Sequence, residues 1–150
     1  MIVKGIRLPM RIDNFFIELR DVLDEINNGD EFYWSILGLW MTGDLGLGQS
    51  VLDLENRIKN LENGLFISWE DLNDLAKKIW QTIEISVIGC KDKKLLLRYE
   101  DDQEMYETCD IVIQMIDSSY WEIFSKDERL VNRLAEKFKN TEFLNSDFEK

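Results

Sequence analysis

The segment from Gly43 to Ser50, GDLGLGQS, comes closer to a known chemical motif than any other stretch of the chain. Gly43 and Gly48 have the spacing of a phosphate-binding loop, with a predicted strand before the segment and a predicted helix after it. Such a loop uses a lysine to place positive charge on the terminal phosphates, but Gln49 stands at that position. Asp44 adds a negative charge. We therefore interpret the segment as a flexible strand-to-helix loop.

Carboxylates gather in a second segment of possible chemical interest, which runs through residues 101–107 as DDQEMYE. Its acidic members are Asp101, Asp102, Glu104 and Glu107. The calcium-loop pattern alternates Asp or Asn with other residues and then requires a glycine, and this segment has no glycine. We predict a solvated acidic connection, and no metal or other cofactor.

The usual catalytic side chains are scarce. The chain contains no histidine, the commonest general base and the commonest metal ligand. Its two cysteines, Cys90 and Cys109, form no CxxC pair, and we predict free buried thiols rather than a disulfide. No serine lies in a G-x-S-x-G sequence. These absences favour a protein without catalytic activity, although catalysis by lysine or carboxylate alone stays open.

The charge balance points to a basic partner. The net charge of −12 should repel phosphate backbones and anionic lipid, which argues against nucleic-acid or membrane-surface binding. Five tryptophans are many for 150 residues. Most are expected in the core, but aromatic side chains also anchor interfaces. Our candidates for an exposed protein-binding surface are Trp34, Trp121 with its neighbour Glu122, and the four carboxylates of residues 101–107.

The length and composition of the chain predict one soluble domain. A length of 150 residues with 45% hydrophobic content is enough for a single core. The first residues are too polar for a signal peptide, and no run of about 18 apolar residues could span a membrane. We expect a cytoplasmic protein with one domain over residues 1–150, of which 141–150 form a frayed tail.

The clearest fold signal lies between Cys109 and Lys139. Residues 111–116 are apolar at nearly every position, which predicts an inner strand, and residues 117–119 are turn formers. A second strand follows, with Trp121 on one face and Glu122 on the other. The sequence from Ser125 to Glu128 fits a capping box before an amphipathic helix.

The other elements complete an α+β pattern. We predict a mostly antiparallel sheet with three to four helices, ending in a β-hairpin and a C-terminal helix. Gly29 is expected to close the first helix in a left-handed conformation. The remaining predicted elements are a strand over 2–8, a helix capped by Asp13 that buries Phe15 and Phe16, a strand over 32–40, helices over 51–61 and 69–80, a short strand over 65–67, and a hairpin of 82–89 with 95–100.

Several short sequences resemble an uncharacterised family of small acidic bacterial proteins with no assigned activity. The resemblance rests on Lys4-Gly5-Ile6, the first helix, Phe32-Tyr33-Trp34, the run Ile116 to Tyr120, and Ser125-Lys126-Asp127. In type, the chain is also similar to immunity proteins of bacterial toxin systems, which are small, acidic and cytosolic. Neither resemblance implies any functional residue.

Two functions follow as hypotheses. The first is a non-catalytic protein-binding module that neutralises or regulates a basic protein partner, as a toxin-immunity protein does. The second is a small-ligand sensor or enzyme with a pocket lined by carboxylates and tryptophans. A flat acidic surface with exposed aromatic residues would favour the first, and a deep cavity with converging polar groups the second.

Overall fold

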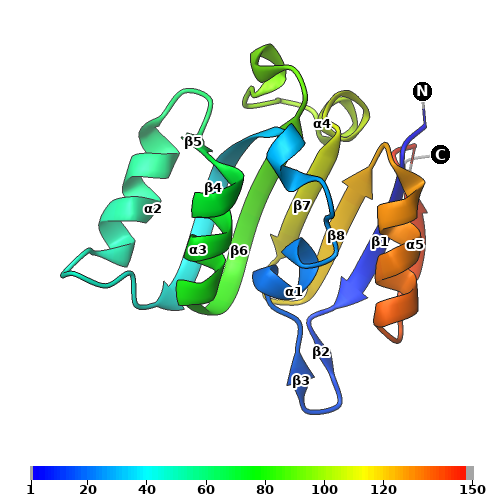
Figure 1. Cartoon of the computed structure of the whole chain (residues 1–150), viewed down its shortest axis with the longest axis horizontal. Coiled ribbons are helices and arrows are strands. Elements are labelled where there is room, and N and C mark those ends of the chain that lie inside the picture. The colour runs from blue at the N-terminus through cyan, green and yellow to red at the C-terminus, as the bar shows by residue number, and fades with distance from the viewer. Residues whose placement is uncertain (1, 148–150) are drawn as a thin grey trace.

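Seven strands form one antiparallel sheet in the order β5-β4-β6-β7-β8-β1-β9 (Figure 1). The computed structural model describes residues 2–147. The strands are β1 (Lys4–Pro9), β4 (Tyr33–Gly43), β5 (Leu65–Ile67), β6 (Ile79–Cys90), β7 (Ile111–Ile116), β8 (Tyr120–Ser125) and β9 (Glu142–Asn145). A separate small hairpin pairs β2 (Arg11–Ile12) with β3 (Phe15–Phe16). The predicted α+β class with a mostly antiparallel sheet is confirmed.

Helices cover the first face of the sheet. They are α1 (Leu19–Leu23), α2 (Val51–Asn60), α3 (Trp69–Lys78) and α5 (Glu128–Lys137). In Figure 1, α1, α3 and α5 lie in front of the sheet, and α2 lies beside its β4 end. Ser50 and Ser68 cap α2 and α3, because each hydroxyl accepts a hydrogen bond from the backbone N–H three residues on. The larger core lies between these helices and the inward side chains of the strands.

Two tryptophans anchor connecting segments to this core. The indole N–H of Trp34 donates to the carbonyl of Gly29 at 2.8 Å, and that of Trp121 donates to the carbonyl of Ile17 at 2.9 Å. Both rings are almost wholly buried, so each indole satisfies its one donor inside the protein. The segment between β1 and β4 is thereby fixed to the sheet at two points.

The second face of the sheet is covered only at one end. A row of mainly apolar side chains crosses it, formed by Ile88, Val112, Phe124, Gly5 and Leu144. The helix α4 (Asp102–Thr108) and residues 95–99 pack on this row and close a smaller core. Cys90 and Cys109 are buried there as free thiols, as predicted. Among residues 2–147, the side chains that follow on this face are half-buried or exposed, and we call this part the open face.

Two predicted elements on this face are wrong. Residues 95–100 do not pair with β6, because β4 and β7 already occupy both of its edges. They follow the short 3₁₀ helix η2 (Lys93–Leu95), and the guanidinium of Arg98 fixes them by donating to backbone carbonyls that include Leu37 and Ile58. Residues 101–107 belong mainly to α4 rather than to a loop, because Met105 and Tyr106 bury one side of a helical turn.

The region after β1 also differs from expectation. Asp13 caps no helix; it takes a left-handed conformation in the β2–β3 turn, with φ of 52°. Phe15 and Phe16 are therefore about half exposed on the protruding hairpin instead of buried (Figure 1). Gly29 is not left-handed but opens the 3₁₀ helix η1 (Gly29–Glu31), where a Cβ would clash with the Trp69 ring.

Three smaller corrections concern ends of elements. Trp80 does not extend the helical stripe of α3 but lies in β6, where it is 69% exposed. Asp127, rather than Ser125, caps α5 by accepting a hydrogen bond from the Arg129 backbone N–H. Residues 142–145 form the edge strand β9 against β1, while residues 148–150 of the predicted tail lie outside the described residues.

Glu18, just before α1, generates a stability prediction. Burial, followed by repulsion from Asp21, raises the pKa of Glu18 from 4.5 to about 7. The folded state therefore holds this proton more tightly than the unfolded state does. The resulting stabilisation is complete below about pH 4.5 and is lost as the pH rises through about 7.

In urea denaturation, the free energy of unfolding of the wild type should fall relative to Glu18→Gln as the pH rises from about 4.5 to about 7. The difference should level off at higher pH. Parallel pH profiles for the two proteins would contradict the assignment.

Candidate protein-binding surface

The open part of the second sheet face begins with a row of polar side chains. Cross-strand pairing places these residues side by side on adjacent strands: Ser86, Gln114, Glu122, Arg7 and Glu142. Because side chains alternate along each strand, this row follows directly on the buried apolar row. The hydroxyl of Tyr106, from α4, donates to Oε1 of Gln114 at 2.8 Å and marks the border between the covered and open parts.

Beyond the polar row, larger side chains line the open face. Trp40 lies on β4 directly opposite Glu84 on β6 and is 55% exposed. Ile116 and Tyr120 are cross-strand partners on β7 and β8. A cavity of about 280 Å³ is lined by Trp40, Glu84, Asp117 and residues of β7.

The carboxyl groups of Glu84 and Asp117 form a close pair. Asp117 belongs to the β7–β8 turn, in which it and Ser118 have positive φ, and the Ser118 N–H donates to the Ile83 carbonyl at 2.8 Å. The turn therefore holds Asp117 beside β6. The pKa of Glu84 is raised, first by its hydrogen bond with Asp117, then by desolvation and repulsion. We refer to Trp40, Glu84 and Asp117 together as the Trp40 cluster.

A second cluster on the same face contains its own cation. The guanidinium of Arg7 lies over the Tyr120 ring, 4.4 Å from the centroid. It forms an ion pair of 2.7 Å with Glu122 and a longer one of 3.5 Å with Glu142. We refer to these four residues as the Arg7 cluster. Two carboxylates thus flank an arginine that is stacked on an aromatic ring.

The residues predicted to form one binding surface lie in different parts of the structure. Trp34 and Trp121 are 1% and 0% exposed, so they cannot be surface anchors, and this prediction was wrong. Both face the helix-covered side of the sheet. There the large apolar area of each ring is buried and each indole N–H has a hydrogen-bond acceptor. Glu122 does lie on the open face, but it is already paired with Arg7.

The four predicted carboxylates lie on or beside α4, which adjoins the open face. Asp102 and Glu104 are exposed. Asp101 caps the helix, since its Oδ1 accepts from the Gln103 N–H, and Glu107 accepts from the side chains of Gln103 and Ser146. These interactions give Asp101 and Glu107 structural roles, so Asp102 and Glu104 are the better positions for testing charge.

Sequence reasoning missed the Trp40 cluster. Trp40 was placed in a strand, but the face to which it points depends on the register shifts that interrupt the β4–β6 pairing. Asp117 was read only as a turn former. The one available signal was the alternation of residues 82–89, whose polar side contains Glu84 and Ser86 and suggests an uncovered face.

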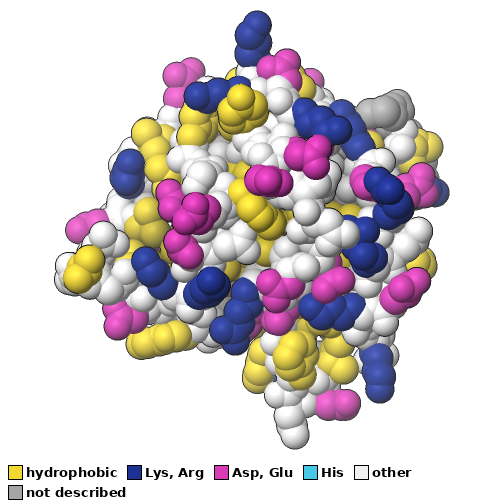
Figure 2. Space-filling model, in the orientation of Figure 1, with side chains coloured by type: hydrophobic (Ala, Val, Ile, Leu, Met, Phe, Trp, Pro, Cys, Tyr) yellow, Lys and Arg dark blue, Asp and Glu magenta, His cyan; other side chains and the backbone are white. Residues whose placement is uncertain are grey.

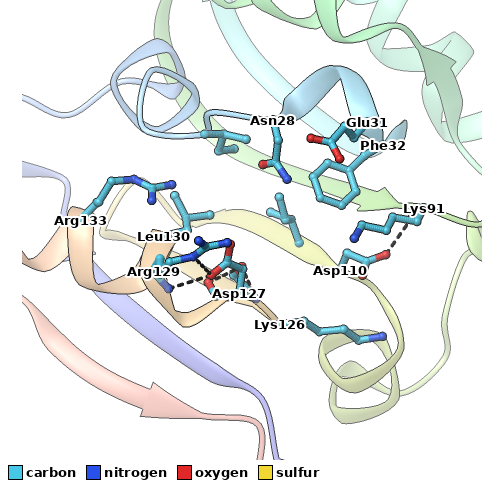
Figure 3. A pocket seen from close by; sticks show the side chains of 13 residues that line it. Asn28, Glu31, Phe32, Lys91, Asp110, Lys126, Asp127, Arg129, Leu130 and Arg133 are labelled. Atoms are coloured by element: carbon cyan, nitrogen blue, oxygen red, sulfur yellow. Dashed lines mark hydrogen bonds and ion pairs between the residues drawn. The ribbon is translucent and has the colours of Figure 1, made fainter.

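A different cavity, of about 490 Å³, lies where β6, β7 and β8 meet the start of α5 (Figure 3). Charged side chains of both signs surround it, but several are already engaged. Asp127 pairs with Arg129 at 2.9 Å, Asp110 accepts from the Lys91 N–H, and Arg133 donates to the Glu25 carbonyl. Phe32 is its aromatic residue, and no tryptophan lines it.

The helix-covered face has a mixed charge pattern. Figure 2 shows Lys and Arg side chains interspersed with Asp and Glu over this face. Within residues 2–147, no three His, Cys, Asp or Glu side chains are grouped so as to hold a metal ion. No helix in the described part of the chain is long and apolar enough to cross a membrane.

Comparison with known proteins gives no relative: no family model, curated protein or solved structure matches the chain.

The paired carboxylates generate a titration prediction. In Asp117→Asn, the pKa of Glu84 should fall toward its ordinary value of 4.5, because the hydrogen bond with the Asp117 carboxyl group and the neighbouring negative charge are both removed. Carboxyl-carbon NMR over a pH series would measure it. The pKa of Asp127, which is lowered mainly by its hydrogen bond from Arg129, should stay unchanged as a control. An unaltered Glu84 titration would show that the two groups do not interact.

The burial of Trp121 and the exposure of Trp40 generate a stability prediction. Trp121→Phe should lower the free energy of unfolding by about 2–4 kcal/mol, because it leaves a cavity and a buried Ile17 carbonyl without its donor. Trp40→Phe, the matched control, should change it by about 0.5 kcal/mol or less. Equal effects in urea denaturation would contradict the assignment of Trp121 to the core.

Proposed function

We propose that this protein is a non-catalytic binding module that neutralises or regulates a basic protein partner, in the manner of an immunity protein. The observation that carries the proposal is the open sheet face, where the exposed Trp40 stands beside the carboxyl pair of Glu84 and Asp117. Asp102 and Glu104 add exposed negative charge on the first turn of α4, the helix that borders this face at Tyr106.

The proposed mechanism has two stages. The net charge of −12 and the carboxylates of this side attract a basic protein and accelerate its encounter. Trp40 then supplies a large apolar contact. Tryptophan is one of the residue types that contribute most to the binding energy of interfaces. A partner seated on the open face would have its own site covered by the sheet.

The test begins with affinity capture from the cell of origin, followed by kinetic measurement on the captured protein. Asp102→Lys/Glu104→Lys should slow association by about tenfold at low salt, and the difference should shrink at high salt. Trp40→Ala should mainly accelerate dissociation.

The matched control is Glu70→Lys/Asp74→Lys on α3, which makes the same change in net charge on the helix-covered face. If this control slows association equally, the partner responds to total charge and not to the proposed surface. Recovery of no basic protein at low salt would remove the main support for the function.

A further inference from the structure

The Arg7 cluster and the Trp40 cluster share one chemical design. In the first, an aromatic ring and two carboxylates surround the guanidinium of Arg7. In the second, the ring of Trp40 accompanies the carboxyl groups of Glu84 and Asp117. Both stand on the open face of the same sheet, on neighbouring groups of strands.

The Arg7 cluster contains a cation of its own, and the Trp40 cluster differs from it in this respect. No lysine or arginine within residues 2–147 lines the Trp40 cavity or forms an ion pair with Glu84 or Asp117. Instead, both carboxyl groups line the same cavity, and each disfavours the negative charge of the other. A cation placed between them would relieve their repulsion, and the exposed indole face of Trp40 would attract the same cation.

We propose that the Trp40 cluster is a subsite for a single arginine side chain of the basic partner, held as Arg7 is held in its own cluster. This inference rests on the proposed function, because the partner's arginine is the occupant. The cavity of about 280 Å³ suits one side chain better than a larger molecule, since drug-sized ligands occupy about 300–1,000 Å³.

Arginine fits the cluster better than lysine does. A planar guanidinium can stack on an indole while its N–H groups point outward in the ring plane toward two separate carboxylates. A lysine ammonium is a compact point charge that is more strongly hydrated and cannot stack. The cluster therefore selects for geometry as well as for charge.

The test uses small probes, so that it does not require the partner. N-acetyl-arginine-N-methylamide is titrated into ¹⁵N-labelled protein, and the indole N–H signals are followed by NMR. Trp40→Phe identifies the Trp40 signal. That signal should shift saturably, with an apparent Kd about tenfold lower than for the uncharged citrulline analogue, which has nearly the same shape. The lysine analogue should bind more weakly than the arginine probe.

Two controls accompany the titration. Trp80 is 69% exposed and does not line the Trp40 cavity, so its indole signal should move little. In Glu84→Gln/Asp117→Asn, the preference for arginine over citrulline should disappear. The signals of the buried Trp34 and Trp121 report whether that variant keeps its fold.

An equal response to arginine and citrulline, or no response of Trp40, overturns the subsite. The result is separable from the proposed function. If a basic partner is captured and binds through Asp102 and Glu104, but the Trp40 signal does not respond to the arginine probe, only the subsite is refuted. An arginine-specific shift without any captured basic protein would refute the protein-binding function and leave a cation subsite.

Discussion

Burial of the central strands β6 and β7 is the constraint on which the rest of the fold depends. Their first-face side chains, such as Val87 and Ile113, need the cover of helices, which α1, α3 and α5 help to provide. Their second-face side chains Ile88 and Val112 also need cover, and α4 with residues 95–99 supplies it at one end only. Antiparallel sheets can leave part of one face to solvent where its residues are polar, and this sheet does so.

The open face follows from that partial cover. Within two residues along β7, the second face changes from the buried Val112 to the hydrogen-bonded Gln114. The charged residues beyond this border are arranged in two groups, one in which Arg7 pairs with Glu122 and Glu142, and one that consists of two carboxyl groups beside Trp40. Such a surface offers an incoming cation both charge and an aromatic ring, which is the physical basis of the binding proposals.

Local sequence rules predicted much of the fold because they act within one element. The apolar run of residues 111–116 forms a strand and residues 117–119 form a turn, both where expected. The rules failed where an element depends on its neighbours. Residues 95–100 resemble a strand, but no free edge of β6 remained for them, and Phe15 and Phe16 lie in a hairpin because Asp13 could adopt a left-handed turn.

The sequence by itself determined the α+β class, the free thiols and the acidic surface, because composition and periodicity carry that information. Only the tertiary structure decided which tryptophans are exposed. Trp34 and Trp40 occupy the same strand six residues apart, and strict alternation would put both on one face. The register shifts in β4 place Trp34 in the core and Trp40 on the open face. Pairing between strands distant in sequence sets those shifts, and it also brings Asp117 beside Glu84.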